Sequence, residues 1–497
     1  MEVRIVNVNQ KDILVYPVPY RTYFSGGDYE FNGEVKCIVS SYFNNDNALE
    51  LLQELWANFT CSTGKLYIEK STNMQKNEFA ITRIAANMSF PILESGFEYA
   101  IDVNSEGVFV SSNGEKGIIH AFATLLQMIE PKNLEACREK FAIKNCSISD
   151  KPAITFRGIH ICIFPETTLI FIQKVIRLSG LMKFTHIVIE FWGMLKYDVM
   201  SELSWENAYS KDQIRPLIKE ANALGMEVIP MFNHLGHATS SRVVYGKHVV
   251  LDQNPRKALL FEPDGWTWCL SNLDTINLLK EVRKELIELC GKGQYFHLGC
   301  DEAYTFATCG LCKNTNKLDL LTNYINSLAD DLKNYNRRGI IWGDALLDTT
   351  KWESPNYATS RPDQRTHEIL HKLDRSLIID DWQYYITESK IPTSEYFMGK
   401  GFDVILSPWR DLKNIRALSN GAQSINAFGF LATTWNTLNE SIELIPIVGE
   451  CAWAGDRKEG KIEVDLMRCV SASLQRKLVP VHGIYKDAGW HEDDTKG

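Results

Sequence analysis

The chain has 497 residues, 45% of them apolar and 23% charged, and a formal net charge of −9. This length allows a large core and more than one domain, and the acidic balance argues against a nucleic-acid partner. No stretch approaches the roughly 18 apolar residues of a membrane span, and the first 20 residues lack the features of a signal peptide. We therefore expect a cytoplasmic protein without a membrane partner, whose 12 cysteines are mostly buried, reduced thiols.

Residues 1 to about 150 show short strand patterns and few helices. The strand-like segments are 36–43, 64–70 and 98–112, and the last is typical of two strands joined by a turn at 104–107. Residues 116–130 are apolar at helical spacing, and Pro131 is expected to stop that helix. The pattern predicts a small α+β accessory domain over 1–150, with a boundary near Pro152.

Eight short apolar runs follow, and each is succeeded by a helical or loop segment. They lie at 157–164, 185–192, 226–233, 294–302, 338–346, 376–385, 403–409 and 429–436. Repeated strand–helix alternation of this kind predicts a (β/α)8 TIM barrel over 151–497, ending in a helical tail. A doubly wound open sheet is the alternative, but no GxGxxG follows the first strand to favour it.

Active sites of such barrels lie at the carboxyl ends of the strands, and here those ends carry acids and tryptophans. Two adjacent carboxylates, Asp301 and Glu302, follow the fourth strand, and a Trp recurs at the ends of the last four strands. Flat aromatic rings beside carboxylates are typical of carbohydrate sites, although packing explains single tryptophans equally well. The residues at these ends are Asn233, His234, His237, Asp301, Glu302, Trp342, Asp344, Asp381, Trp382, Tyr384, Trp409, Arg410, Trp435 and Asn436.

Several of these segments together resemble the family-20 glycoside hydrolases, the β-N-acetylhexosaminidases. HLGCDE at 297–302 is similar to the signature H-x-G-G-D-E, with Cys300 in place of the second Gly. FRGIH at 156–160 and MEVIPMFNHLGH at 226–237 resemble the first and third barrel strands of the family, and the likeness extends over about residues 90–455. The resemblance implies a divergent exo-acting β-N-acetylhexosaminidase that acts on a glycan with a terminal N-acetylhexosamine.

The resemblance also implies a substrate-assisted retaining mechanism, in which the 2-acetamido group of the sugar is the nucleophile. Glu302 is then the general acid and base, with a pKa that we expect burial among aromatic rings to raise. Asp301 accepts a hydrogen bond from the acetamido N–H and stabilises the oxazolinium ion. His237 is expected to support Glu302, and His234 to be structural.

Further substrate-binding residues follow from the same resemblance. Tyr384 is the expected donor to the acetamido oxygen, because Arg410 stands where the family tyrosine follows the seventh strand. The tryptophans form an apolar socket for the acetamido methyl group, and the acids bind sugar hydroxyls. The residues assigned to substrate binding are Trp342, Trp382, Trp435, Tyr384, Asp344, His237, Trp409, Glu190, Glu440 and Arg157.

The first two strands depart from the family pattern. The family has R-G-x-x-x-D-x-x-R on strand 1, and here Arg157 and Gly158 are followed by Cys162 and Pro165 at the last two positions. The missing Arg normally holds the 3- and 4-hydroxyls, so galacto-configured and gluco-configured sugars are equally expected. Glu190 is the residue that we expect to compensate.

A C-x-x-C pair, Cys309 and Cys312, follows the acidic pair. Such a pair is half of a zinc site or a redox pair in some proteins. A structural zinc needs four ligands, and no second C-x-x-C or spaced His pair follows, so two reduced thiols are expected here. The implied chemistry needs neither a metal nor a cofactor.

Three alternative functions are carried forward. A carbohydrate-binding relative without hydrolysis would not need Glu302, and a glycosidase with a protein nucleophile would use Asp344 or Glu190 against Glu302. A metal-dependent hydrolase would need ligands on the first strand, which offers only His160. The long connection between the third and fourth strands places Trp266 and Trp268 as an expected lip of the site.

Overall fold

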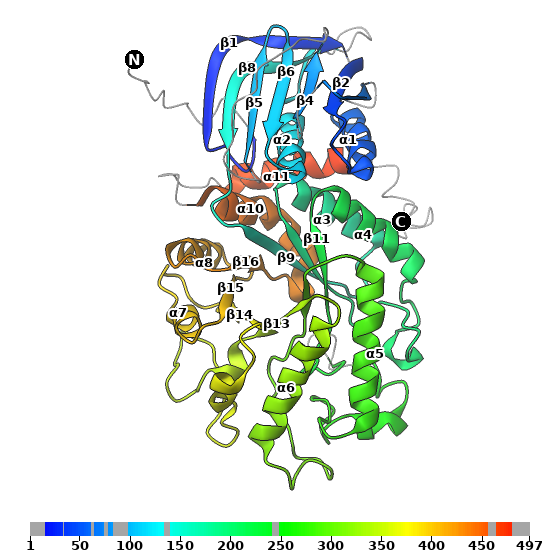
Figure 1. The fold of residues 1–497 in the computed structure, drawn as a ribbon, viewed down its shortest axis with the longest axis vertical. Coiled ribbons are helices and arrows are strands. Elements are labelled where there is room, and N and C mark those ends of the chain that lie inside the picture. The colour runs from blue at the N-terminus through cyan, green and yellow to red at the C-terminus, as the bar shows by residue number, and fades with distance from the viewer. Residues whose placement is uncertain are drawn as a thin grey trace, which may run out of the picture.

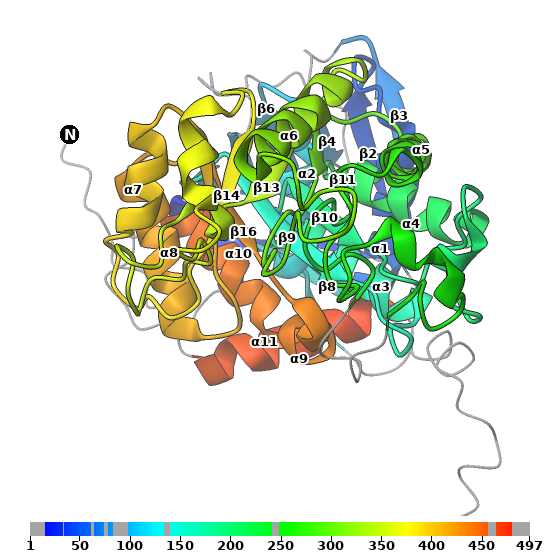
Figure 2. The ribbon, with the colours of Figure 1, turned by 90° about the horizontal axis from the view of Figure 1, so that it is seen from below.

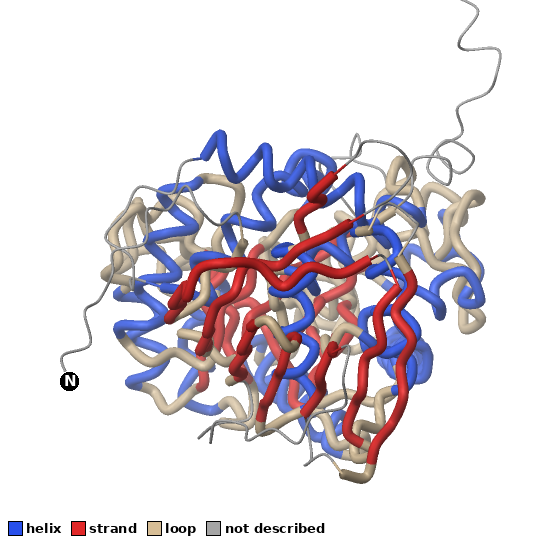
Figure 3. The backbone as a smooth tube through the Cα atoms, turned by 90° about the horizontal axis from the view of Figure 1, so that it is seen from above, coloured by secondary structure: helices blue, strands red, loops and turns tan. Residues whose placement is uncertain are grey.

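The computed structural model describes residues 15–32, 34–60, 64–73, 78–82, 98–133, 140–240, 248–455 and 464–479. The first part is an eight-stranded sheet with the order β1-β8-β5-β6-β4-β2-β3, in which β7 also pairs with β8 (Figure 1). Figure 3 views this sheet from above. Its strands are β1 (Arg21–Asn32), β2 (Glu34–Ser40), β3 (Lys65–Ser71), β4 (Glu78–Thr82), β5 (Tyr99–Asn104), β6 (Gly107–Ser112), β7 (Glu130–Asn133) and β8 (Lys140–Asp150).

Two helices accompany this sheet, α1 (Asp46–Phe59) and α2 (Glu115–Met128). The predicted hairpin is present as β5 and β6, with Asn104 paired to Gly107. The helix predicted over 116–130 ends at Met128, because Pro131 belongs to β7. Helix α1 was not predicted, although Asn45 caps it by accepting a hydrogen bond from the Ala48 N–H, as a helix-start residue does.

The second part is a closed parallel barrel. Eight strands follow one another around the ring, and β16 closes it by pairing with β9, which excludes the open sheet. The predicted TIM barrel is thus confirmed. Its strands are β9 (Phe156–Cys162), β10 (His186–Glu190), β11 (Glu227–Met231), β12 (Tyr295–His297), β13 (Arg338–Trp342), β14 (Ile378–Trp382), β15 (Asp403–Ser407) and β16 (Gly429–Ala432).

Helices surround the barrel in the view from below (Figure 2). A 3-10 segment, η5 (Thr366–Lys372), stands where the helix after β13 is expected. Among the described helices, none is long and apolar enough to cross a membrane. The helices of this part are α3 (Leu169–Leu181), α4 (Lys211–Ala223), α5 (Leu273–Cys290), α6 (Lys317–Lys333), α7 (Pro392–Gly399), α8 (Leu412–Ser424), α9 (Leu438–Ser441), α10 (Ile445–Ala454) and α11 (Val464–Leu478).

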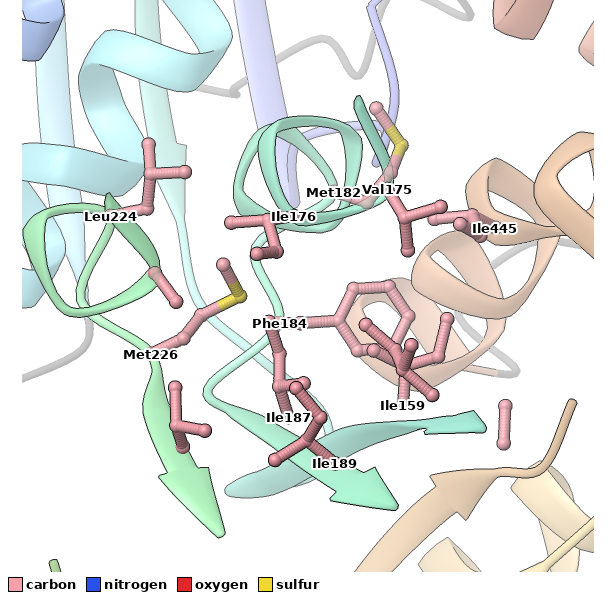
Figure 4. Close-up of a cluster of buried hydrophobic side chains, with 14 of the residues drawn as sticks. Ile159, Val175, Ile176, Met182, Phe184, Ile187, Ile189, Leu224, Met226 and Ile445 are labelled. Carbon is pink, nitrogen blue, oxygen red and sulfur yellow. The ribbon is translucent and has the colours of Figure 1, made fainter. Parts of the chain in front are cut away.

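Apolar side chains fill two layers of the barrel part. One layer lies between the strands and the outer helices, where Ile187 and Ile189 of β10 meet Ile176 of α3 and Met226 beside β11 (Figure 4). The other layer fills the barrel interior and includes Val188, from the opposite face of the same strand. This alternation is that of a strand buried on both faces.

A fully buried ion pair joins the N-terminal sheet to the amino ends of the barrel strands. Lys183 Nζ lies 2.8 Å from Asp150 Oδ2 at the end of β8 and 2.7 Å from the Tyr99 hydroxyl of β5. The Trp453 indole of α10 donates to the other oxygen of Asp150. Helix α11 lies between the two parts and packs against α1, α3 and α10 (Figure 1). The carboxyl ends of the strands therefore face away from the N-terminal sheet.

Candidate active site

The two adjacent acids lie in a turn rather than on a strand. Strand β12 ends at His297, and the next residues adopt positive φ angles of 67° at Gly299, 75° at Cys300 and 45° at Glu302. The left-handed conformation is uncommon for residues with a side chain, and at Cys300 it falls where the family signature has Gly. The strand predicted over 294–302 is therefore too long, and the turn explains how two neighbouring carboxylates reach one site.

Close contacts at two glycines hold this turn in place. A Cβ on Gly299 would lie 2.0 Å from Asn233 Oδ1, and a Cβ on Gly236 would lie 2.0 Å from the carbonyl oxygen of Asp301. Gly236 belongs to the loop that follows β11, so glycine at this position lets the β11 loop pack directly on the backbone of the acidic pair. The loops after β11 and β12 thus form one unit.

Asp301 is buried, and one of its oxygens has no hydrogen-bond partner among the residues that the structure describes. Its Oδ2 lies 3.6 Å from His237 Nε2, whereas its Oδ1 is shielded and unpaired. Burial raises the pKa of Asp301 to about 8, against the opposing effect of the nearby His237. A buried acceptor without a donor costs free energy, and such groups in folded proteins are often functional.

The Glu302 carboxylate accepts hydrogen bonds from several side chains. Its Oε1 accepts a hydrogen bond of 2.7 Å from the Tyr357 hydroxyl, and its Oε2 lies 3.1 Å from His237 Nε2. Burial alone would raise the pKa of Glu302, but hydrogen bonds from His237, Tyr304 and Tyr357 lower it to about 2. The expectation of a raised pKa is therefore wrong for this structure, because it took account of the aromatic surroundings and not of these donors.

His237 bridges the two acids. Burial lowers the pKa of its imidazole, but the charges of Asp301 and Glu302 raise it more, to about 9. The ring packs on Trp266 with 4.3 Å between centroids, and its Nδ1 lies 3.4 Å from the Ser240 carbonyl oxygen. An imidazolium between two carboxylates is positioned to exchange a proton with either one.

Asp344 and Trp266 fix the backbone of Glu302 on both sides. Asp344 Oδ2 accepts the Glu302 N–H at 3.0 Å and the Thr359 hydroxyl at 2.8 Å, and its Oδ1 accepts the Trp382 indole N–H at 3.2 Å. The Trp266 indole donates to the Glu302 carbonyl oxygen at 2.7 Å. Asp344 is buried and both of its oxygens are engaged, so it positions Glu302, and its role as a sugar-hydroxyl ligand stays a prediction.

Four aromatic side chains form a continuous series beside the acids, which we call the aromatic arc: Tyr357, Trp382, Tyr384 and Trp409. Their ring centroids follow one another at 4.2, 4.9 and 5.5 Å. The Tyr384 oxygen accepts the Trp435 indole N–H at 2.8 Å and lies 3.1 Å from the Thr433 hydroxyl. An indole nitrogen only donates, so Tyr384 keeps its own proton for another acceptor.

Trp342 and Trp435 pack against each other next to the arc. Their ring centroids are 5.6 Å apart, and Trp435 also meets the edge of His160 at 4.9 Å. Trp435 is half-buried, whereas Trp342 is buried and packs on His297 with 4.4 Å between ring centroids and 52° between ring planes. Trp435 thus stands nearer the surface, and Trp342 lies beneath it.

Arg157 is not a ligand of this site. It is the second residue of β9 and lies at the amino end of the barrel, where its guanidinium donates to the carbonyl oxygens of Ile154, Thr155 and Lys183. The family motif was matched only at its first two positions, and those positions lie at the amino end of the strand. The assignment of Arg157 to substrate binding is therefore corrected to a structural role.

The roles predicted for Glu190 and Trp268 are also corrected. Glu190 Oε1 accepts from Asn233 at 2.7 Å and its Oε2 lies 3.2 Å from His160 Nε2, so neither oxygen replaces the missing strand-1 Arg. Trp268 is fully buried and donates to the Asn233 carbonyl oxygen, and only Trp266 of the expected lip reaches the acids. Both side chains serve the packing beneath the site.

Glu440 lies at the exposed rim. Its side chain is 78% exposed and pairs with Arg410 at 3.8 Å, while Arg410 stacks on the Trp409 ring. No described contact joins Glu440 to Asp301 or Glu302. Its role as a sugar ligand stays a prediction.

Sequence reasoning missed Tyr357 and Tyr304. Tyr357 lies in the loop after β13, and its hydroxyl lies 3.3 Å from that of Tyr304, two residues beyond Glu302. Neither tyrosine stands at a strand end, so no spacing in the sequence marked them. The sequence also missed Cys269, whose sulfur lies beside those of Cys309 and Cys312.

A second group of donor atoms, from His160, Cys162 and Glu190, lies at the ends of the first two strands. The Cys162 sulfur accepts the Trp192 indole N–H at 2.7 Å, and both Glu190 oxygens have the partners given above. Because these atoms are already engaged, we assign no metal to them. The His160 imidazole also packs against Trp342 and Trp435.

Comparison with known proteins agrees with this architecture. Residues 189–424 match the family described as glycosyl hydrolase family 20, catalytic domain. The chain is 22% identical over 390 residues to beta-hexosaminidase 1 of Coccidioides posadasii, covering 72% of this chain and 60% of that protein. It is 21% identical over 330 residues to lacto-N-biosidase of Bifidobacterium bifidum, covering 64% of this chain and 28% of that protein. The chain thus spans less than two thirds of the length of either relative.

Solved structures show the same fold. A β-N-acetylhexosaminidase of Bacteroides fragilis matches with a TM-score of 0.66 and 16% identity, covering 97% of this chain and 96% of that one. An exo β-N-acetylglucosaminidase of Vibrio harveyi, in complex with N-acetylglucosamine, matches with a TM-score of 0.66 and 15% identity, covering 93% and 77%. Residues 189–424 therefore match the catalytic domain of glycosyl hydrolase family 20, and the chain is a distant relative of a β-hexosaminidase and of a lacto-N-biosidase.

Proposed function

We propose that the protein is an exo-acting β-N-acetylhexosaminidase that removes terminal β-linked GlcNAc or GalNAc with retention of configuration. The observation that carries the proposal is Asp301 Oδ1, a buried acceptor without a partner beside Glu302. An acetamido N–H is a donor for this oxygen. That hydrogen bond turns the acetamido carbonyl toward C1. The positive charges of the forming oxazolinium ion and of His237 oppose the burial that raises the pKa of Asp301, so Asp301 ionises as the ion forms and stabilises it.

The hydrogen bonds of the neighbouring acids argue against a protein nucleophile. A retaining glycosidase of that kind needs a second free carboxylate about 5–5.5 Å from the acid, and an inverting one needs it about 6.5–9.5 Å away. Asp344 uses both oxygens to hold Glu302, Trp382 and Thr359, and Glu190 uses both for Asn233 and His160. Asp301 adjoins Glu302 in sequence and faces the same histidine, so it does not flank a glycosidic bond opposite Glu302.

The proton for the leaving group comes through His237. Without substrate, Glu302 is ionised and the imidazole is protonated at neutral pH, because their pKa values are about 2 and about 9. The 3.1 Å contact from Nε2 to Oε2 lets the proton pass to Glu302 as the glycosidic oxygen begins to accept it. Glu302 then removes a proton from the water that opens the oxazolinium ion.

The acetamido oxygen and methyl group need partners of their own. The Tyr384 hydroxyl, whose oxygen already accepts from Trp435, donates its proton to the acetamido oxygen. Trp382 and Trp435 supply the apolar surface for the methyl group. The relatives support a sugar of this class, since one neighbour's structure contains N-acetylglucosamine.

The configuration at C4 stays open in this proposal. The strand-1 Arg of the family pattern is replaced by Pro165, and Glu190 is engaged in the interior. We therefore propose both GlcNAc and GalNAc as substrates, with the rim residues Trp409 and Glu440 nearest to the outer hydroxyls.

The test compares 4-nitrophenyl β-GlcNAc, β-GalNAc and β-glucoside as substrates of the wild type. We expect hydrolysis of at least one acetamido sugar, no comparable cleavage of the glucoside, and inhibition by a thiazoline analogue of the oxazolinium ion. Glu302→Gln should lower kcat by about 10²–10⁴, as loss of a general acid does. Asp301→Asn should lower it by about 10²–10³, as loss of a charge-stabilising group does.

Glu395→Gln, an exposed change on α7, is the matched control and should leave kcat unchanged. Cleavage of the glucoside at a rate comparable to the acetamido sugars would show that a protein nucleophile exists. No hydrolysis of any of the three by the wild type would refute the proposed exo-hexosaminidase activity.

A further inference from the structure

Three cysteines from two loops converge next to the acidic pair. Cys269 lies in the long loop between β11 and α5, and Cys309 and Cys312 lie in the loop between β12 and α6. The Cys269 sulfur is 3.4 Å from that of Cys309 and 3.7 Å from that of Cys312. One carboxylate oxygen of Glu262 joins them, and all four donor atoms lie within 4.8 Å of one another.

These spacings match a tetrahedral metal site better than a disulfide. Zinc–thiolate bonds of about 2.3 Å at tetrahedral angles place neighbouring sulfurs about 3.8 Å apart. Disulfide sulfurs are about 2.05 Å apart. The 3.4 and 3.7 Å separations therefore fit sulfurs that share a cation rather than a bond.

Glu262 adds an independent observation. Its side chain is almost fully buried, and its Oε1 has no hydrogen-bond partner in the described part of the chain. Its Oε2 accepts the N–H groups of Thr308 and Cys309, both at 2.8 Å. A buried carboxylate beside three thiols, with one oxygen unpaired, lacks a positive partner among the described residues, and such a charge is costly to bury alone.

We propose that Cys269, Cys309, Cys312 and Glu262 bind one Zn²⁺ as a structural site. Among the common divalent cations, zinc is the one that thiolate ligands favour. Four protein ligands leave no open position for a reacting water. Cys269, Cys312 and Glu262 are buried, and only Cys309 is partly exposed. This closed arrangement distinguishes the site from a catalytic zinc centre.

The site would join the two loops that build the acidic centre. Glu262 and Cys269 flank Trp266, whose indole holds the Glu302 carbonyl oxygen, and Cys309 follows Glu302 on the same loop. The metal thereby positions Glu302 through the backbone, without contact to substrate. The proposal does not depend on which sugar the enzyme accepts.

The test measures the metal content of the full-length protein, expressed without a metal-chelating tag and purified without added metal. We expect one zinc per chain by elemental mass spectrometry, released when a mercurial reagent titrates the thiols. Cys269→Ser and Cys309→Ser should lose at least nine tenths of it. Cys469→Ser, an exposed cysteine on α11, is the matched control and should keep one zinc.

A spectroscopic readout on the wild type avoids reliance on variants that fail to fold. Cobalt substitution should give an intense visible spectrum of a tetrahedral site and a near-ultraviolet thiolate charge-transfer band. A weak octahedral spectrum would overturn the proposal. So would wild-type protein without zinc, whether its three cysteines were alkylated as free thiols or recovered as a Cys269–Cys309 disulfide.

Discussion

A single methyl group added to Gly236 should displace the turn that carries Asp301 and Glu302. A Cβ at this position would lie 2.0 Å from the Asp301 carbonyl oxygen and 2.9 Å from both the Glu302 carbonyl carbon and the Ala303 nitrogen. These atoms are backbone, so no side chain can rotate away. Restoring the smallest tolerated contact requires a movement of about 1 Å, a displacement that typically costs catalysis about 100-fold.

We therefore expect Gly236→Ala to lower kcat/KM about 100-fold, which corresponds to about 2.7 kcal/mol of transition-state stabilisation. The assay is hydrolysis of the better 4-nitrophenyl acetamido sugar, with thermal unfolding measured in parallel because overpacking costs about 1–3 kcal/mol of stability. Gly399→Ala on α7 is the control, since no atom lies within 4 Å of a Cβ there. A Gly236→Ala enzyme that folds and keeps kcat/KM within about threefold of wild type would refute the argument from close packing.

Two further predictions concern the donors to Glu302. Tyr357→Phe should raise the pKa of Glu302 by about 1–2 units, because a hydrogen bond to a charged group contributes about 1.5–3 kcal/mol. A lowered native pKa stabilises the fold fully above the unfolded value of 4.5, and this stabilisation is lost as pH falls through about 2. Urea unfolding should therefore show a larger loss of stability in the variant at pH 7 than at about pH 2.5. For His237→Gln the pH dependence is reversed. The raised pKa of His237 stabilises the fold fully below pH 6.5, and this stabilisation is lost as the pH rises through about 9. The free energy of unfolding of the wild type should therefore exceed that of the variant by more at pH 6 than at pH 9.5. Equal differences at the two pH values of either pair would contradict the corresponding assignment.

The barrel could be predicted because its signal repeats along the chain. Eight apolar runs separated by helical segments leave few arrangements other than a closed parallel sheet. The bounds were less accurate where a strand runs into a turn, as at β12, which ends at His297 and not at Glu302. Helix α1 was missed because the segments before and after it have strand patterns, even though Asn45 is a residue that favours a helix start.

The acidic pair could be placed from sequence, but its surroundings could not. Tyr357 and Cys269 come from loops whose folding is not periodic, and they reach the site from 55 and 33 residues away in sequence. The low pKa of Glu302 depends on donor contacts of about 3 Å, and sequence gives no such distances. Arg157 shows a different error. The family motif matched only at the amino end of β9, and Arg157 therefore lies at the end of the barrel away from the acids.

The geometry of Glu302 is decided by other loops more than by its own strand. Its φ of 45° is unfavourable for a residue with a side chain, and a conformation of this kind costs about 1–3 kcal/mol unless the surroundings impose it. Here Asp344 accepts its N–H, Trp266 donates to its carbonyl oxygen, and Gly236 packs on the peptide before it. Because three contacts from two other loops fix one backbone, the side chain has a single direction, toward His237 and Tyr357. Substitutions in those loops should therefore alter the acid without touching the sugar, which explains how a distant relative of the family keeps this centre while its first strand has diverged.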